Sequence, residues 1–359
     1  MQVERENSML YYALISFGIL CLAPLDKQNK KQKKTFIILS FILVAFFAAA
    51  RGDFTSDYRS YYSFFQQIKE YSFGEIWNTS FYTEKGFVLF NKLISLFTNS
   101  SVFFIAVMSV IIVFLYYKEF EKKSQMMWFS VLLFVGIGGY YDSFNISRQI
   151  LAAAIVFSGS KYLYQKEPAK YFMVAVLASF FHRSALLMIP CYYILTLKVN
   201  KVKTSLVVIM GLVLVLAIQP SIQVFQKLFP VYAGYTYGMT GGSINAIFLP
   251  IIILLFLSVS FFLKQTEFHM NQDGNNVLVN GLILYSIFII LGTQVQMTAR
   301  MAYFFQPYLC LLIPNYIDSY KNTKAKTVLI LLVSVLSILY PLITLSGTGY
   351  DPYYFIWGK

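Results

Sequence analysis

The stretch Lys30–Arg51, KKQKKTFIILSFILVAFFAAAR, decides the class of fold. Lysines fill four of its first five positions, residues 35–50 carry no charge, and Arg51 ends the run. An uncharged apolar run with cations at both ends is typical of a helix that crosses a lipid bilayer. Apolar runs of 14 to 20 residues recur along the whole chain, so the sequence predicts an all-α, polytopic integral membrane protein.

The composition excludes other classes of protein. Of the 359 residues, 58% are hydrophobic and 13% are charged, against roughly 25% charged in a soluble domain. The net charge of +13 would suggest nucleic acid in a soluble protein. Here the cations form short clusters between apolar runs, which favours the bilayer surface as the partner and no nucleic acid. The three cysteines and two histidines form no metal-binding pattern, and no nucleotide-binding motif is present, so we expect no metal and no cofactor.

The apolar runs predict about twelve transmembrane helices in a single domain over residues 1–359. Two larger segments, 51–100 and 220–243, are predicted to be loops on one face of the membrane. The sixth and seventh helices are short and are separated by His182-Arg183, so they could instead form one broken helix or a re-entrant pair. The predicted helices are 9–25, 35–50, 101–117, 126–141, 149–164, 171–182, 184–197, 204–219, 244–263, 277–293, 301–317 and 327–345.

The distribution of cations orients these helices. If the lysine cluster at 26–34 is cytoplasmic, the cytoplasmic segments hold eighteen cations, all of them lysines. The outer face then receives eleven cations, including all six arginines. This satisfies the positive-inside rule and places both termini outside the cytoplasm.

The separation of arginine from lysine predicts an anion site on the outer face. The positive-inside rule does not distinguish the two residues, whereas the planar guanidinium binds phosphate through two parallel hydrogen bonds. The alternative is that these arginines only anchor helix ends at the interface. The four that lie at or beside helix ends are Arg51, Arg148, Arg183 and Arg300.

The outer segment 51–100 predicts two amphipathic helices that could roof a cavity. Aromatic and aliphatic residues recur at helical spacing after Asp57 and again after Glu84. A carboxylate beside an arginine cluster could act as a general base, and Asp57, Glu84 and His182 are the candidates. For each carboxylate, an ion pair or a helix cap is the alternative. The Arg51-Gly52-Asp53 triplet is discounted as an adhesion motif because Arg51 ends a membrane span.

Residues for sugar contacts are sought among the polar and aromatic side chains of the outer segments. Aromatic rings stack on sugar faces, although aromatic residues also form the ordinary belt at the membrane interface. The candidates are Tyr58, Asp142 and Tyr303.

Four short blocks resemble the EpsG branch of the Wzy-type polysaccharide polymerases. They are Arg51-Gly52-x-Phe54-x-x-Asp57-Tyr58-x-x-Tyr61, Glu84-Lys85-Gly86-Phe87, Ser147-Arg148-Gln149-x-Leu151-Ala152 and His182-Arg183-Ser184-Ala185-Leu186. The resemblance is clearest from about residue 50 to 190. The C-terminal third is similar mainly in hydropathy and at Arg300.

This resemblance implies a membrane glycosyltransferase of the GT-C type in the bacterial cytoplasmic membrane. Such enzymes join undecaprenyl-pyrophosphate-linked repeat units into capsule, exopolysaccharide or O-antigen on the outer face. Donor and acceptor would both be lipid-linked, and a chain-length regulator and a flippase would be the expected partners. Arg148, Arg183 and Arg300 would then bind the pyrophosphate, with Arg51 in support.

Other functions remain open from the sequence. A flippase for lipid-linked sugars would share the arginine face, but should carry more polar residues near the middle of the membrane. A ligase breaks the same bond and is hard to distinguish. An acyltransferase would be expected to feature a histidine deep in the membrane, whereas His182 is predicted at the outer end. A non-catalytic scaffold gives no reason for one-sided arginines.

Overall fold

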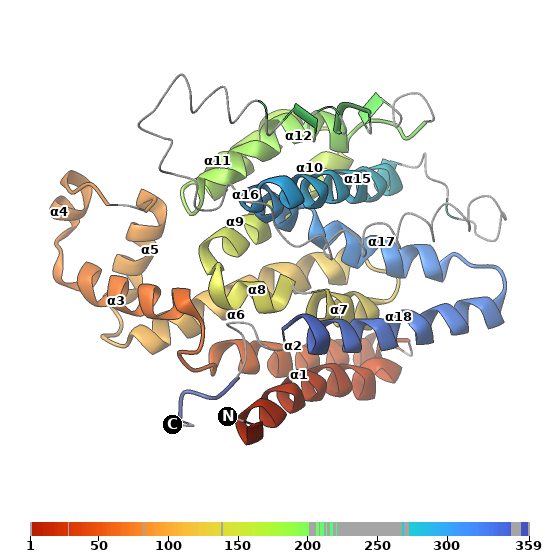
Figure 1. Ribbon diagram of the computed structural model, residues 1–359, viewed down its shortest axis with the longest axis horizontal. Helices are drawn as coiled ribbons and strands as arrows, with labels where there is room; N and C mark the ends of the chain where they lie inside the picture. Colours follow the sequence, from red (N-terminus) through yellow and green to blue (C-terminus); the bar gives the residue numbers. More distant parts are fainter. Residues whose placement is uncertain are drawn as a thin grey trace.

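The computed structural model describes residues 2–27, 29–81, 83–137, 139–200, 273–345 and 353–357, with Phe268 and scattered positions between 206 and 220. All regular secondary structure named over these residues is helical, which confirms the all-α class (Figure 1). Predicted loop 220–243 and predicted helix 244–263 lie outside the described residues, and predicted helix 204–219 lies largely outside them.

Four described helices are long and apolar enough to cross a membrane. They are the main parts of α2 (Lys30–Ala49), α6 (Ser101–Lys123), α15 (Asp273–Gln294) and α18 (Thr323–Thr344). A helix of 20 residues spans about 30 Å, the thickness of the hydrocarbon core. These spans and the shorter apolar helices fit a multi-pass membrane protein, while the count of twelve stays a prediction.

The other described elements are α1, which has 21 residues, and a set of shorter helices. They are α1 (Gln2–Leu22), η1 (Ala23–Lys27), α3 (Ser56–Glu70), α4 (Phe73–Asn78), α5 (Lys85–Ser95), α7 (Met127–Gly136), α8 (Gly139–Asn145), α9 (Ser147–Ser158), α10 (Lys161–Tyr164), α11 (Pro168–Ser179), η2 (Arg183–Leu187), α12 (Met188–Leu195), α16 (Gln296–Ala299), η5 (Arg300–Phe304) and α17 (Gln306–Asp318).

The predicted helix 126–141 is broken into α7 and α8, so the prediction of one continuous span is wrong there. Glycines at the break let other helices come close: a Cβ on Gly136 would lie 2.5 Å from the Ser337 carbonyl oxygen of α18. The carbonyl of Ile137, which the break releases, accepts a hydrogen bond of 2.7 Å from Gln306 Nε2. Tertiary contacts therefore compensate for the interrupted helix. The predicted helix 149–164 is likewise divided at Gly159 into α9 and α10.

The segment around His182 is a hairpin of short helices, one of the arrangements that the sequence left open. α11 ends at Ser179, and after a turn the chain continues as η2 and α12. The rings of Tyr171 and Tyr192, from the far ends of α11 and α12, lie 5.6 Å apart, so the two helices run antiparallel. At about 1.5 Å per residue, the 12 residues of α11 are too short to cross the hydrocarbon core.

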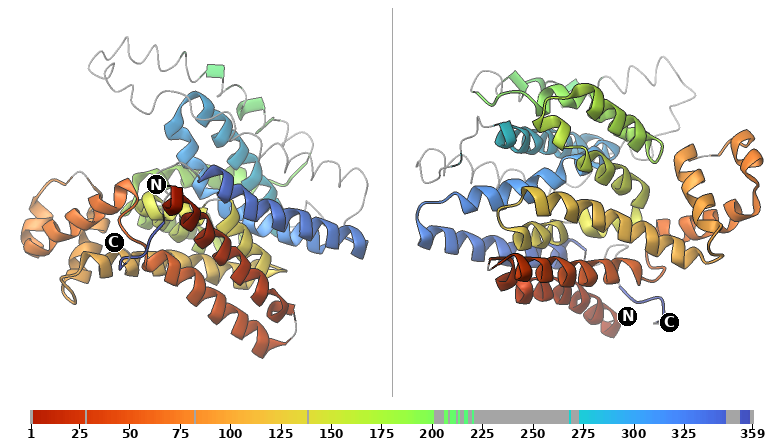
Figure 2. Two further views of the ribbon diagram at one scale, coloured as in Figure 1. Left: turned by 60° about the horizontal axis from the view of Figure 1, so that its bottom comes forward. Right: turned by 180° about the vertical axis from the view of Figure 1, so that it is seen from behind.

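The lysine-rich and arginine-rich segments lie at opposite ends of the bundle. At one end, Lys123 pairs with Glu119 at 2.9 Å, and Asn315 bonds the Lys123 carbonyl at 3.0 Å. At the other end, Arg51 follows the end of α2, Arg148 is the second residue of α9, and Arg300 begins η5. The helices α3, α4 and α5 project beyond this second end (Figures 1 and 2).

Both chain termini lie at the arginine-rich end. Arg51 and Phe355 form an isolated antiparallel bridge, and the Gly52 amide donates to the Tyr354 carbonyl at 2.7 Å. The rings of Tyr11 and Tyr353 lie 5.1 Å apart, which joins α1 to the C-terminal segment. The two termini therefore share one side, as predicted, and which side of the membrane this is stays a prediction.

Candidate active site

An ion pair between Glu84 and Arg148 forms the centre of the site. Arg148 Nη1 lies 2.8 Å from Glu84 Oε2, and the two side chains are 30% and 14% exposed. The other carboxylate oxygen of Glu84 accepts the backbone N–H of Arg183 at 3.1 Å. One carboxylate therefore connects the start of α5, the start of α9 and the break between α11 and η2. Burial favours the neutral acid, but the Arg183 amide and Arg148 outweigh it and lower the pKa of Glu84, so this carboxylate is ionised at neutral pH.

Glu84 reaches this position because the first turn of α5 contacts Phe180, the residue that follows the end of α11. Glu84 is the N-cap residue of α5, but its side chain makes no capping hydrogen bond. Instead, the free N–H of Phe87 donates to the Phe180 carbonyl at 3.1 Å. Gly86 permits this approach, since a Cβ there would lie 2.7 Å from the Phe180 carbonyl oxygen and 2.5 Å from its Cβ. The contact with Phe180 therefore explains two features of the Glu84-Lys85-Gly86-Phe87 block: Gly86 permits the contact, and the contact positions Glu84.

Arg148 is held at several points while its side chain stays 30% exposed. Its backbone N–H donates to Tyr61 Oη at 3.3 Å, and Nη1 bonds the Thr83 hydroxyl as well as Glu84. The Tyr61 hydroxyl also interacts with the Arg148 side chain. A guanidinium has five N–H donors, and its planar arrangement suits a phosphate bound through two parallel bonds. Arg148 also occupies the first turn of α9, where helix dipole and side chain both favour an anion.

His182 is half-buried and held in one tautomer. Its Nδ1 lies 2.6 Å from Ser184 Oγ and accepts the Ser184 backbone N–H at 3.4 Å. Because a backbone N–H can only donate, Nδ1 carries a lone pair and the neutral ring bears its proton on Nε2. Burial lowers the pKa of His182, and Arg148 and Arg300 lower it further against the opposing effect of Glu84. The ring is therefore neutral at pH 7 and offers an Nε2–H donor.

Asp57 is the second carboxylate of the site and is held by α8. The Asn145 side-chain oxygen accepts the Asp57 backbone N–H at 3.0 Å and the Ser56 hydroxyl at 3.1 Å. The start of α3 is therefore capped by a residue from another helix rather than by its own Thr55. Burial raises the pKa of Asp57, and the charges of Arg300 and Arg148 oppose this shift. Those interactions place Asp57 within electrostatic range of both arginines.

Arg183 and Arg300 complete the cationic lining. Both are exposed, and each is fixed through its backbone: Arg183 through its N–H to Glu84, Arg300 through its carbonyl, which accepts Gln149 Nε2 at 2.9 Å. The charges of Arg148 and Arg300 act on both Asp57 and His182, whereas Arg183 contributes its backbone N–H to Glu84 and carries an exposed side chain. The site thus brings arginines together with two carboxylates.

A cavity of about 320 Å³ adjoins Arg148. It lies between α3 and the segment 79–87. Its hydroxyls and amide can bond sugar hydroxyls, and its aromatic rings offer flat apolar faces. Residues that line it include Ser60, Tyr61, Phe64, Gln67, Thr79, Ser80, Phe81, Thr83, Phe87 and Arg148.

Some sequence-predicted site residues lie elsewhere. Arg51 is only 1% exposed and is enclosed by Ser109 and the rings of Tyr58 and Phe144, so it does not face this site and cannot serve as an adhesion triplet. Tyr58 is buried against Arg51. Asp142 interacts electrostatically with the phenols of Tyr116, Tyr285 and Tyr340 in the interior of the bundle.

The structure also bears on two other sequence predictions, the role of Tyr303 and the question of a metal site. Tyr303 is partly buried against the hydrophobic core from η5. Over the part of the chain that the structure describes, no group of three His, Cys, Asp or Glu side chains could hold a metal ion.

Several residues that organise the site had no predicted role. Tyr61, Thr83, Gln149 and Ser184 each bond an arginine, a backbone group of one or the ring of His182. Tyr61, Gln149 and Ser184 belong to the family blocks, and Thr83 directly precedes Glu84, so these positions were the signal that the sequence contained. Nothing local marks Asn145 as the cap of α3, because the two are far apart in the chain.

A model of one protein family matches residues 9–355 of the chain, and its description is the EpsG family. The chain belongs to the EpsG family. This confirms the resemblance of the four blocks and extends it over the C-terminal third. EpsG membership supports a membrane protein of polysaccharide polymerisation, of the Wzy type in general. The comparisons with curated proteins and with solved structures each gave no match.

Proposed function

We propose that this EpsG-family protein is a membrane glycosyltransferase that polymerises undecaprenyl-pyrophosphate-linked repeat units. The observation that carries the proposal is the convergence of Arg148, Arg300 and the Arg183 backbone with two carboxylates near a cavity of about 320 Å³ that Arg148 lines. A pyrophosphate leaving group needs cations that are already in place, and a sugar needs hydroxyl and aromatic groups. The site offers both within one corner of the bundle.

The reaction transfers the growing glycan from its lipid carrier to a hydroxyl of the incoming unit. The bond between the anomeric carbon and the pyrophosphate oxygen breaks, and its electron pair leaves with undecaprenyl pyrophosphate. The acceptor oxygen forms the new bond to that carbon, and its proton passes to a base. Negative charge grows on the phosphate oxygens, where the guanidinium of Arg148 and the exposed Arg183 and Arg300 would stabilise it.

Of the three candidate bases, the geometry favours Asp57. Glu84 is committed to Arg148 and the Arg183 amide, and His182 carries its proton on the nitrogen that could face a ligand. Asp57 has a raised pKa, which makes its carboxylate a stronger base than an ordinary aspartate. We therefore assign the base to Asp57, positioning of Arg148 to Glu84, and a hydrogen bond to the substrate to His182.

The membrane setting follows from the same assignment. The arginine-rich end would face the outside of the bacterial cytoplasmic membrane, where lipid-linked units await polymerisation, and the lysine-rich end would face the cytoplasm. A flippase that supplies units and a chain-length regulator are the proposed partners. Capsule, exopolysaccharide or O-antigen would be the product.

The test uses purified full-length protein in detergent with a synthetic undecaprenyl-pyrophosphate repeat unit. We expect longer lipid-linked glycans and released undecaprenyl pyrophosphate, with Arg148→Ala lowering the rate of the first condensation by about 10²–10³-fold, as for a lost oxyanion donor. Lys170→Ala, which removes an exposed cation at the other end, is the matched control.

Two results would contradict the proposal. An Arg148→Ala protein that folds and polymerises at the wild-type rate would remove the arginine from the chemistry. Absence of any glycan product, together with transfer of intact lipid-linked sugar across proteoliposomes, would identify a flippase instead.

A further inference from the structure

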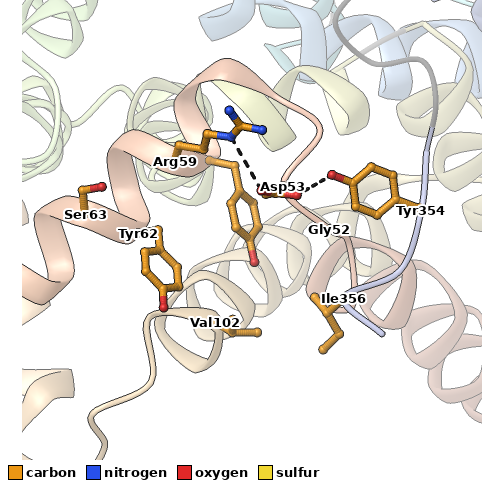
Figure 3. Close-up of a pocket in the computed structure, with 9 residues that line it drawn as sticks. Gly52, Asp53, Arg59, Tyr62, Ser63, Val102, Tyr354 and Ile356 are labelled. Carbon is orange, nitrogen blue, oxygen red and sulfur yellow. Dashed lines mark hydrogen bonds and ion pairs between the residues drawn. The ribbon is translucent and has the colours of Figure 1, made fainter. Parts of the chain in front are cut away.

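Figure 3 shows the residues that line a second cavity, of about 400 Å³. This cavity lies on the opposite side of α3 from the cavity beside Arg148. Positions 58, 59, 62 and 63 of α3 line this cavity, whereas positions 60, 61, 64 and 67 line the cavity beside Arg148. At 100° per residue these two sets occupy opposite arcs of the helix. The first turn of α6 and the C-terminal segment 353–357 close the second cavity.

The wall of this cavity is built by a close contact between chain segments distant in sequence. The ring of Tyr354 lies against Gly52, where a Cβ would be 2.3 Å from a ring carbon. The Tyr354 hydroxyl donates to Asp53 Oδ1, and Arg59 Nε lies 3.6 Å from Asp53 Oδ2 (Figure 3). Tyr62 adds a second aromatic ring that is 43% exposed. The Asp53 carboxylate therefore lies between the Tyr354 hydroxyl and the Arg59 guanidinium, in a cavity that Tyr58 and Tyr62 also line.

This lining matches a neutral, hydroxyl-rich ligand. The charges of Asp53 and Arg59 compensate each other, so the cavity lacks the excess of cations that a phosphate requires. An apolar ligand would displace water from the Asp53–Arg59 pair without offering hydrogen bonds in its place, which costs free energy. A sugar ring can place its hydroxyls on the carboxylate and guanidinium and its C–H face on a tyrosine ring. The volume falls within the roughly 300–1,000 Å³ typical of small-molecule sites.

We propose that this cavity is a second carbohydrate subsite, which binds an uncharged sugar of the glycan chain while the reacting end lies beyond α3. The identity of the ligand rests on the proposed function, whereas the cavity and its chemistry do not. A glycan held at two places would stay bound between additions. The subsite would therefore set product length rather than the rate of a single condensation.

Binding is tested apart from catalysis. The probes are lipid-free oligosaccharides of one to three repeat units, from partial acid hydrolysis of the polysaccharide of the producing cells. Their affinity for detergent-solubilised full-length protein is measured by calorimetry for wild type, Tyr62→Ala and Arg59→Ala. Both side chains are well exposed, Arg59 at 73%, so these variants should fold. Tyr354→Phe keeps the ring against Gly52 and removes only the hydroxyl. Trp77→Ala, an exposed aromatic of α4 at 77%, is the control.

We expect at least tenfold weaker oligosaccharide binding in each cavity variant and wild-type binding in Trp77→Ala. The first condensation should keep its rate in the cavity variants, and the ladder of products should shift to shorter chains. Wild-type binding and an unchanged ladder in all three cavity variants would overturn the inference, as would displacement of the bound oligosaccharide by inorganic pyrophosphate. Cavity-dependent binding by a wild-type protein that makes no polymer would uphold the subsite and refute the proposed function.

Discussion

At the scale of single residues, one corner of the protein holds side chains of opposed protonation behaviour. Glu84 is kept ionised by its partners, whereas burial makes Asp57 easier to protonate. His182 is kept neutral by burial and by neighbouring arginines. Groups whose pKa values are pushed in different directions at one site are typical of acid–base chemistry, although ion-pair networks also perturb pKa values.

The raised pKa of Asp57 predicts the acid limb of the pH–rate profile. A base must be ionised, so the rate should fall as pH drops through a pKa above the ordinary aspartate value of about 3.9. Asp57→Asn should lower the condensation rate by about 10²–10⁴-fold and abolish that limb. The measurement is the initial condensation rate between pH 4 and about 8.

The thermal stability of Asp57→Asn distinguishes a role of Asp57 as a base from a structural role. A raised pKa in the folded state means that protonation stabilises the fold, a contribution present at low pH and lost as pH rises through that pKa. Asp57→Asn resembles the protonated form and should unfold at the same or a higher temperature at neutral pH. A marked loss of thermal stability in this variant would instead indicate that the charge of Asp57 holds the fold.

The tautomer of His182 predicts the order of the reaction rates of variants substituted at this position. If Nε2–H donates to the substrate, His182→Gln retains a donor and His182→Ala does not. A lost hydrogen bond to a charged group costs roughly 1.5–3 kcal/mol, or about 10–150-fold in rate. We expect His182→Ala to show this loss and His182→Gln to recover most of the rate. Equal inactivity of both variants would point to a base at His182, and ¹⁵N chemical shifts of the ring would report the tautomer directly.

At the scale of elements, the site depends on how α5 meets α11. Glu84 has no capping bond of its own, and its position follows from the backbone contact of Phe87 with Phe180. The break between α11 and η2 then supplies the Arg183 amide that orients the carboxylate. Of the features that this contact needs, only the glycine at position 86 can be recognised from the sequence block.

Gly86→Ala should separate α5 from α11 and lower both stability and activity. The added Cβ would meet backbone and Cβ atoms of Phe180, and overpacking of this kind costs typically about 1–3 kcal/mol. Thermal unfolding in detergent and the condensation rate measure the two effects. Gly74→Ala in α4 is the matched control, because a Cβ there meets nothing within 4 Å and alanine favours a helix. Equal behaviour of the two variants would contradict this role of Gly86.

At the scale of the whole molecule, the bundle separates two kinds of cation. Lysines cluster where α6 and α17 end, and arginines cluster where α2 ends and α9 begins. The four long apolar helices connect these ends across roughly the thickness of a bilayer. The arginine-rich end also carries α3–α5, both cavities and both termini, so it is where a substrate from one side of the membrane would bind.

Cysteine labelling tests the orientation of the whole molecule. In a background with the exposed Cys21 changed to serine, Arg59→Cys and Lys324→Cys mark the two ends. A membrane-impermeant thiol reagent should label Arg59→Cys in intact cells and Lys324→Cys only after permeabilisation, because the lysine-rich end is predicted to be cytoplasmic. The reverse pattern would invert the topology and place the candidate site in the cytoplasm.

Hydropathy and local residue patterns were enough to predict the helical membrane class, the division of lysines from arginines and the family blocks. These features depend on hydropathy and on residues that are close together in the chain, so the amino-acid sequence is sufficient to predict them. It also identified Asp57, Glu84, Arg148, His182, Arg183 and Arg300, which the structure gathers at one end of the bundle.

Only the folded structure shows which of these residues lie close together and how their surroundings shift their protonation. Burial of Arg51, the capping of α3 by Asn145, the tautomer of His182 and the cavity closed by Tyr354 all arise from contacts between segments far apart in the chain. The breaks in the predicted helices 126–141 and 149–164 likewise depend on neighbours that replace lost hydrogen bonds or pack closely on glycine. Such contacts set desolvation and hydrogen bonding, and these two effects fix charge and reactivity at the site.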